Sequence, residues 1–440
     1  MRVLTKVGVG TVGAFTLSIG LIAPAAHADS APGPKDIVGV GSDTVQYAID
    51  FVADGDPSGN TGFNQLGNIY RVFNFDATAD ANARLTYGNA GAAGPCAPGT
   101  GTGQGTGAQT TTNTGTPCVQ NSSVVLRAGT LPVRRPNGSG DGTLALKNST
   151  KVNFSRSSSA QGSSLGATFD SIQLGTDTLA MLTASTTNAP ALSAAQLKLI
   201  YLCTATTWTA TNIGGTSSDT IIPVLPQAGS GTRKSFLADI GVTEAQIATN
   251  GGCTKVGEEN DPTIPAQYTT PQDVITPMSN PRLLMWQGQA AAVPGPGTVA
   301  NGFGGFFHDP SCKFLDPTGG ANCFPTPQTL SPVVSEVLTG TPSFGGALYT
   351  DNRALYVYFR DADINSSVIW QPGTTLNWVR TLFYDPCAGS GAPGTGTGPC
   401  TGPGNIYGPG GAPYLATGSG QTEVAQAGIA PTYVFTPSGP

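Results

Sequence analysis

The sequence predicts an α/β fold with two lobes, because strands alternate with helices, glycine turns join them, and the chain is long enough for two cores. A short β-run at 36–40 ends in Gly41, and 44–52 follows with apolar residues at helical spacing. With 440 residues, 38% of them hydrophobic, the chain can build more than one core, and two is the natural division.

The same order of elements recurs in the middle of the chain. An apolar strand is expected at 221–225, followed by the turn Gly229-Ser230-Gly231-Thr232 and a helix at 233–240 that Gly241 closes. The other expected elements are strands at 124–133, 151–154, 175–183 and 354–359, and helices at 193–202 and 376–383.

The first 28 residues have the layout of a secretory signal peptide. Arg2 and Lys6 precede an apolar run from Val7 to Ala23, and Ala-His-Ala stands at 26–28. We therefore expect residues 1–28 to be removed and the mature protein to be secreted. No Cys lies near the cleavage point to carry a lipid anchor, and no later run reaches the ~20 apolar residues of a membrane span.

Charge argues against several classes of partner. Without Arg2 and Lys6, 18 of the 20 basic residues remain against 26 acidic ones, and the basic residues are scattered. Nucleic acid and anionic membranes are therefore poor partners. We expect a monomer without a cofactor.

All eight cysteines follow the expected cleavage site, an even number that predicts disulfides in an oxidising compartment. Pairing of sequence neighbours is one connectivity among many. It joins Cys96 to Cys118, Cys203 to Cys253, Cys312 to Cys323, and Cys387 to Cys400. A zinc site would need Cys-x-x-Cys or partner histidines, and neither occurs. The Gly/Pro-rich tracts at about 88–120 and about 387–413 are expected to be loop insertions.

Four hydroxyl-rich turns carry the chemistry of the sequence. Each follows an expected strand, and a helix start with Ser or Thr hydroxyls favours an anion because its first N–H groups lack partners. The alternative for each is an ordinary turn, helix cap or solvated loop, with Thr232 merely capping its helix. The turns are 41–44, 137–142, 155–159 and 229–232.

The order of these turns resembles the phosphate-binding proteins of high-affinity phosphate ABC transporters and their secreted DING-type relatives. The segment Leu192 to Tyr201, then Trp208, then Ser-Gly-Thr at 230–232 carries its most specific part. The resemblance covers most of 36–241 and is faint afterwards. It implies a type II periplasmic-binding fold, in which two α/β lobes around a hinge enclose the ligand, and a protein that is not an enzyme. Inorganic phosphate or a similar oxyanion is the implied ligand. Whether an ABC permease is a partner of this protein stays open.

Carried over residue by residue, the resemblance implies ligand contacts in each turn. The family's Arg upstream of Gly-Ser-Gly-Thr is here Pro226 or Gln227, so Arg156 is expected to replace it, with Arg233 as the alternative. The family's Asp in the third turn is here Ser158, which leaves the selection of phosphate over sulfate open. Asp43 and Asp141 are the candidate substitutes. The expected ligand-binding residues are Ser42, Asp43, Thr44, Ser139, Asp141, Arg156, Ser157, Ser158, Ser230, Gly231 and Thr232.

The family's architecture implies a chain that crosses between lobes and returns. The first lobe is expected over 36–183, the second over 184–334, and the return to the first over 335–440.

Two other functions stay open. Gly162-Ser163-Ser164-Leu165-Gly166 fits the nucleophile-elbow pattern, so a secreted serine hydrolase would use Ser164 with His308, the one histidine of the mature part. The strand that should precede such an elbow is poor, and one histidine cannot furnish a metal-dependent phosphatase site. The Gly, Thr and Pro tracts alternatively suit a cell-wall or cell-surface protein without a ligand.

Overall fold

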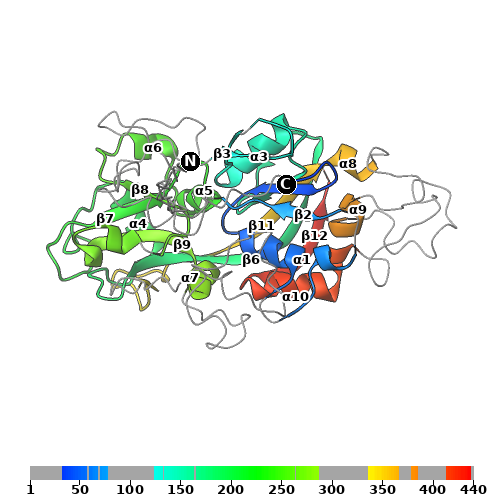
Figure 1. Ribbon diagram of the computed structural model, residues 1–440. Helices are drawn as coiled ribbons and strands as arrows, with labels where there is room; N and C mark the ends of the chain where they lie inside the picture. The colour runs from blue at the N-terminus through cyan, green and yellow to red at the C-terminus, as the bar shows by residue number, and fades with distance from the viewer. Residues whose placement is uncertain are drawn as a thin grey trace, which may run out of the picture.

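The computed structural model describes residues 32–56, 59–67, 70–77, 123–131, 133–162, 165–262, 264–286, 335–365, 378–384 and 413–437. They form a mixed α/β fold around a ten-stranded sheet with parallel and antiparallel pairs (Figure 1). The predicted α/β class is therefore confirmed.

The first strand and helix meet at a glycine, as the sequence predicted. Strand β1 (Ile37–Gly41) is buried throughout and pairs in parallel with β2 (Val72–Asn74) and β5 (Phe154–Ser157). Helix α1 (Gln46–Asp54) follows. Gly41 has φ +117°, and a Cβ there would lie 2.5 Å from the Arg156 carbonyl oxygen. Only glycine fits this turn, because β1 and β5 approach so closely.

The segment expected as one strand at 124–133 is instead a hairpin. Strands β3 (Ser123–Val124) and β4 (Val133–Arg134) pair antiparallel. Gly129 between them has φ +80°, a turn conformation that interrupts an extended run. Helix α3 (Ser139–Asn148) then begins inside the second hydroxyl-rich turn.

Two long antiparallel strands run through the molecule. Strand β6 (Phe169–Ala184) pairs with β11 (Thr350–Arg360) over most of its length. Its first half also pairs with β12 (Ala430–Thr436), and its second half with β9 (Val274–Ser279) and β10 (Ser335–Val337). In Figure 1, β6 passes from the side that holds β7 and α4 to the side that holds α1 and α10.

The middle of the chain forms its own α/β unit. Its elements are α4 (Ala194–Tyr201), β7 (Ile222–Pro226), α5 (Gly231–Asp239), α6 (Glu244–Ala248), β8 (Lys255–Gly257) and α7 (Asn280–Trp286). Ser193 and Gln196 form a capping box at the start of α4. The disulfide Cys203–Cys253, one of the predicted pairs, joins the segment that follows α4 to the segment that precedes β8. The other six cysteines lie outside the described residues.

Hydrophobic side chains gather in two large cores. One core contains Phe51, Phe154 and Leu355, and the other contains Trp208, Phe236 and Ile275. We call the elements around the first core the first lobe and those around the second core the second lobe. Strand β6 supplies residues to both. The limits of the lobes along the chain stay a prediction.

The remaining elements complete the first lobe and the connections. They are α8 (Asp361–Asn365), α9 (Trp378–Leu382) and α10 (Gly418–Gln426), with short 3-10 helices at Phe63–Gln65, Ile264–Gln267, Pro271–Asp273 and Tyr414–Ala416. The helix expected at 376–383 is α9. No helix in the described ranges is both long and apolar enough to cross a membrane. The expected signal peptide and both Gly/Pro-rich insertions lie outside those ranges.

Candidate anion site

The hydroxyl-rich turns of both lobes meet at one buried carboxylate. Oε1 of Glu259 accepts hydrogen bonds from the hydroxyls of Thr44 at 3.1 Å, Ser158 at 3.3 Å and Thr232 at 2.6 Å, and from the backbone N–H of Thr232 at 3.4 Å. Glu259 is 0% exposed. We call these donors, together with Ser139 behind Ser158, the anion cradle. Residues of three of the four predicted turns donate to this oxygen directly, and Ser139 of the fourth turn contacts Ser158, one of those donors.

The second lobe contributes the start of α5. The Ser230 hydroxyl caps this helix by accepting from Arg233 N–H at 3.1 Å, so Ser230 and not Thr232 is the N-cap. The Thr232 hydroxyl is therefore directed to Glu259. Its backbone N–H belongs to the first turn of a helix, where N–H groups lack intrahelical partners and the dipole favours negative charge.

Gly231 allows the two lobes to approach. A Cβ at this position would lie 2.3 Å from Ser158 Oγ and 2.5 Å from Ser139 Oγ, both from the first lobe. The backbone N–H of Gly140 also donates to the Gly229 carbonyl at 2.9 Å. The second and fourth turns are thus in direct contact across the two lobes.

The first lobe aligns its hydroxyls through a relay. Ser158 N–H donates to Ser139 Oγ at 3.0 Å, and the two hydroxyl oxygens lie 3.4 Å apart. Because Ser139 Oγ already accepts from that N–H, its proton is free to point to Ser158 Oγ, whose own proton points to Glu259. Ser139 therefore orients a donor of the cradle.

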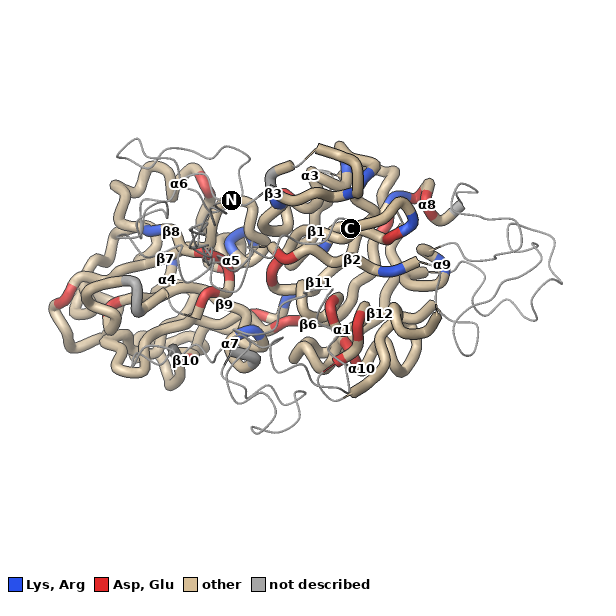
Figure 2. Tube along the Cα trace, viewed as in Figure 1, with Lys and Arg blue, Asp and Glu red and all other residues tan. Residues whose placement is uncertain are grey.

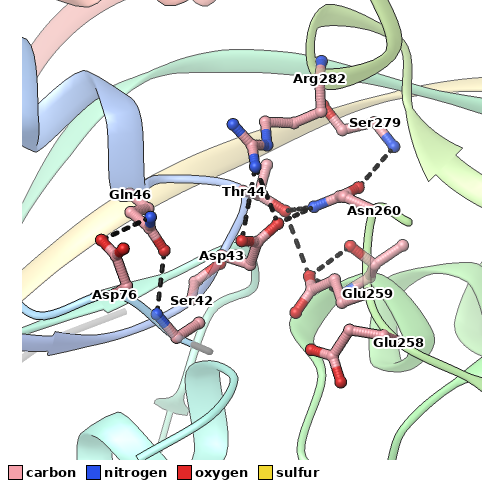
Figure 3. A network of polar contacts seen from close by, with 12 residues as sticks. Ser42, Asp43, Thr44, Gln46, Asp76, Glu258, Glu259, Asn260, Ser279 and Arg282 are labelled. Atoms are coloured by element: carbon pink, nitrogen blue, oxygen red, sulfur yellow. Dashed lines mark hydrogen bonds and ion pairs between the residues drawn. The ribbon is translucent and has the colours of Figure 1, made fainter. Parts of the chain in front are cut away.

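Thr44 is oriented in the same way from another side. Its hydroxyl oxygen accepts from Asn260 Nδ2 at 3.0 Å and from Arg353 Nη2 at 3.3 Å, which directs its proton to Glu259. Figure 3 shows the Asn260 side chain directed at Asp43 and Thr44 of the first turn. Ser279 N–H donates to the Asn260 side chain at 3.0 Å.

Arg353 places a guanidinium beside the cradle. It lies in β11 opposite Asp177 of β6, and its Nε and Nη2 donate to Asp177 Oδ2 at 2.9 and 2.7 Å. Its Nη1 donates to the Thr232 hydroxyl at 2.8 Å. Because Arg353 also reaches Thr44, one cation from β11 contacts a hydroxyl of each lobe.

A second guanidinium lies above the first turn. Arg282 Nη2 forms an ion pair with Asp43 at 3.3 Å and its guanidinium stacks over the Tyr47 ring at 4.0 Å from the centroid. Burial lowers the pKa of Arg282, and the negative charges nearby, including Glu259, act in the opposite direction. Within the described part of the chain, Arg282 Nε and Nη1 are buried without a partner, as are Ser42 Oγ and Glu259 Oε2. Figure 3 shows Arg282, Asp43, Thr44 and Glu259 in one network.

Charged side chains meet where the lobes join. Figure 2 shows acidic and basic segments interleaved in the middle of the molecule, near α5, α7 and β11. In the described part of the chain, no group of three or more His, Cys, Asp or Glu residues is arranged to hold a metal ion.

Arg156 occupies a different place from the one expected. It lies inside β5 rather than in a turn after it, and its guanidinium donates to the carbonyls of Gly41, Ser42 and Phe75 at 3.1, 3.1 and 2.8 Å, and to Asn74 Oδ1. Burial lowers its pKa to about 10. The structure therefore makes Arg156 a support of the first turn, because the register of β5 directs it to backbone carbonyls.

The other expected residues are spread around the cradle. Ser157 Oγ donates to the Ser159 carbonyl at 2.6 Å and so stabilises its own turn. Asp141 lies in the first turn of α3 and is partly exposed. Arg233, the alternative cation, forms an ion pair with Glu244 at 2.6 Å. Ser164 and His308, the residues of the hydrolase alternative, lie outside the described residues.

Sequence reasoning missed Glu259, Arg353 and Arg282. One signal was present in the sequence, because four polar residues, Glu258-Glu259-Asn260-Asp261, stand together directly after the residues of β8, and the structure buries all four. Gln227, which stands where the family's Arg was sought, holds this segment: its Oε1 accepts from Glu259 N–H at 2.7 Å and its Nε2 donates to Glu258 at 3.2 Å. Four consecutive buried polar side chains require partners, and such partners indicate a site.

Comparisons with known proteins give structural neighbours alone. No family model matches the chain, and no curated protein matches it. Among solved structures, the chain is similar to a phosphate ABC transporter substrate-binding protein with bound phosphate from Clostridium perfringens. The TM-score is 0.35 and the sequence identity 14%, and the match covers 56% of this chain and 71% of the other. An ABC-type phosphate transport receptor from Vibrio cholerae gives TM-score 0.36 and 14% identity, covering 74% of this chain and 86% of the other.

The periplasmic phosphate-binding protein PfluDING, solved with phosphate, gives TM-score 0.30 and 16% identity, covering 55% of this chain and 76% of the other. These TM-scores are too low to carry a functional argument, so the function must be inferred from the contacts of the anion cradle.

Proposed function

We propose that this protein is a secreted solute-binding protein that captures a small oxyanion between its two lobes, with inorganic phosphate as the first candidate. The observation that carries the proposal is the convergence of hydroxyls from Thr44, Ser158 and Thr232, and one helix N–H, on a single anionic oxygen. Donors of both lobes share this oxygen, so an anion held there joins the lobes.

The chemistry of the donors suits an oxyanion. Hydroxyls and helix N–H groups stabilise a dehydrated anion by hydrogen bonds, which are stronger when the acceptor is charged. Arg353 adds positive charge while its pair with Asp177 at 2.7 Å keeps the local net charge low. The cradle therefore recognises the geometry of an oxyanion as well as its charge.

The experiment is isothermal titration of the anion-stripped protein with phosphate and then sulfate at neutral pH. We expect phosphate binding with a micromolar or tighter Kd. A flat titration with both anions contradicts the proposal, and favours the cell-surface alternative. Whether a permease receives the ligand is a separate question that binding does not answer.

A matched pair of variants locates the site. Thr44→Val with Thr232→Val removes one cradle hydroxyl from each lobe. Thr249→Val with Thr422→Val removes two exposed hydroxyls that bond within their own helices. Both pairs are made in the Glu259→Gln protein, because in the wild type the same hydroxyls also hold the Glu259 carboxylate. The first pair should weaken phosphate binding by at least about tenfold, the effect of losing one charge-assisted hydrogen bond, and the second pair should leave it unchanged. Equal affinities would place the ligand elsewhere.

A further inference from the structure

The anion cradle is filled by the chain's own carboxylate. Glu259 Oε1 takes all four donors that an oxygen of a bound oxyanion would take. Asp43 has its ion pair with Arg282, and Asp177 has its ion pair with Arg353. Glu259 is held mainly by neutral donors instead, as a ligand of this cradle would be.

The Glu259 backbone is fixed, so its carboxylate is tethered. The Glu259 N–H donates to Gln227 at 2.7 Å, and Glu258 Oε1 accepts from Asn137 at 2.9 Å. Asn260 is held by Asp43 and Thr44 on the other side. A tethered group acts at a high effective concentration, so it competes well with a free anion of similar chemistry.

The carboxylate leaves part of the site unused. Ser42 Oγ, Arg282 Nε and Arg282 Nη1 are buried donors that have no partner among the described residues. Buried donors without acceptors are costly. Both residues flank Asp43 and Thr44 of the first turn, so a tetrahedral oxyanion, with four oxygens instead of two, can offer acceptors that Glu259 lacks.

A second anion cannot share the cradle with Glu259. Both would need the same protons of Thr44, Ser158 and Thr232, and two like charges in one buried site disfavour each other strongly. Entry of a ligand therefore requires the carboxylate to leave.

We propose that Glu259 is an intramolecular competitor that occupies the anion cradle in the ligand-free protein, and that a tetrahedral oxyanion of higher charge binds by displacing it. This inference rests on the proposed function. Displacement makes Glu259 a determinant of specificity, because monoanions such as acetate offer no more charge and no more oxygens than the carboxylate they would replace.

The test compares the phosphate affinity of the wild type with that of Glu259→Gln. The amide keeps the size of the side chain and removes its charge, so it competes less. Glu336→Gln, which removes one charge from an exposed residue of β10, is the matched control. We expect Glu259→Gln to bind phosphate at least about tenfold more tightly than the wild type, and Glu336→Gln to bind as the wild type does.

The outcomes separate the two proposals. If the wild type binds phosphate and Glu259→Gln binds it equally or more weakly, Glu259 is no competitor and the inference is overturned while the proposed function stands. If neither protein binds phosphate, the proposed function itself fails. Glu259→Asp, with a carboxylate one methylene further from the cradle, provides a second variant, expected to bind more tightly than the wild type. Circular dichroism confirms that each variant is folded.

Discussion

Gly231 lies where the two lobes are in contact, so an added methyl group tests that contact. In Gly231→Ala the new Cβ would lie 2.3 Å from Ser158 Oγ and 2.5 Å from Ser139 Oγ. Ordinary contacts need 3.4 Å or more, so the start of α5 and the two serines must move apart by about 1 Å. That movement lengthens the bonds from Ser158 and Thr232 to the anion.

The chain supplies a matched control in Gly418→Ala. Both glycines begin a helix directly after a hydroxyl N-cap, but a Cβ at Gly418 meets nothing within 4 Å. Overpacking costs about 1–3 kcal/mol, whereas Gly→Ala at an open helical site stabilises by about 0.4–1 kcal/mol. Urea unfolding should therefore place Gly231→Ala below the wild type and Gly418→Ala at or above it, with weaker phosphate binding only in Gly231→Ala. Equal stability and affinity for the two variants would refute the close contact.

Four other perturbations test separate parts of the structure. Ser230→Ala removes the cap of α5 and should lower the free energy of unfolding by about 1 kcal/mol in urea. Thr232→Val, made in the Glu259→Gln protein so that the competitor does not mask the effect, should weaken phosphate binding by roughly 10- to 100-fold in titration calorimetry. Burial raises the pKa of the Glu423 carboxyl to about 8, so the folded state retains a proton there that the unfolded state loses near pH 4.5. The free energy of unfolding therefore falls as pH rises from about 4.5 to 8. Glu423→Gln should flatten that part of a plot of melting temperature against pH. Replacing Cys203 and Cys253 by Ser removes a crosslink between residues 50 apart and should lower the free energy of unfolding in urea by about 4 kcal/mol. A decrease of less than about 1 kcal/mol would contradict the pairing.

Local signals predicted the strands, turns and helices that surround the cradle. Strand, glycine turn and helix occur where the sequence indicated around Gly41 and Gly231, because backbone conformation and helix caps depend on neighbouring residues. Thr44, Ser158 and Thr232 were expected as donors on a resemblance to known proteins, and the structure brings their hydroxyls to one oxygen.

The charged partners could not be predicted in the same way. Glu259 is 215 residues from Thr44, and Arg353 is 309 residues from it, so these contacts depend on the packing of the lobes and on the pairing of β11 with β6. Arg156 was expected to face the ligand because it stands among the ligand serines. Its direction is set by strand register, since β5 continues through Ser157 and places it against backbone carbonyls.

Displacement of Glu259 by an oxyanion would be visible in a crystal structure of the protein grown with millimolar phosphate at neutral pH. We predict a phosphate within hydrogen-bond distance of the Thr44, Ser158 and Thr232 hydroxyls and the Thr232 N–H, with the Glu259 side chain turned out of the cradle. Glu259 still bonded to those donors, with phosphate absent or bound elsewhere, would contradict both the anion site and the displacement.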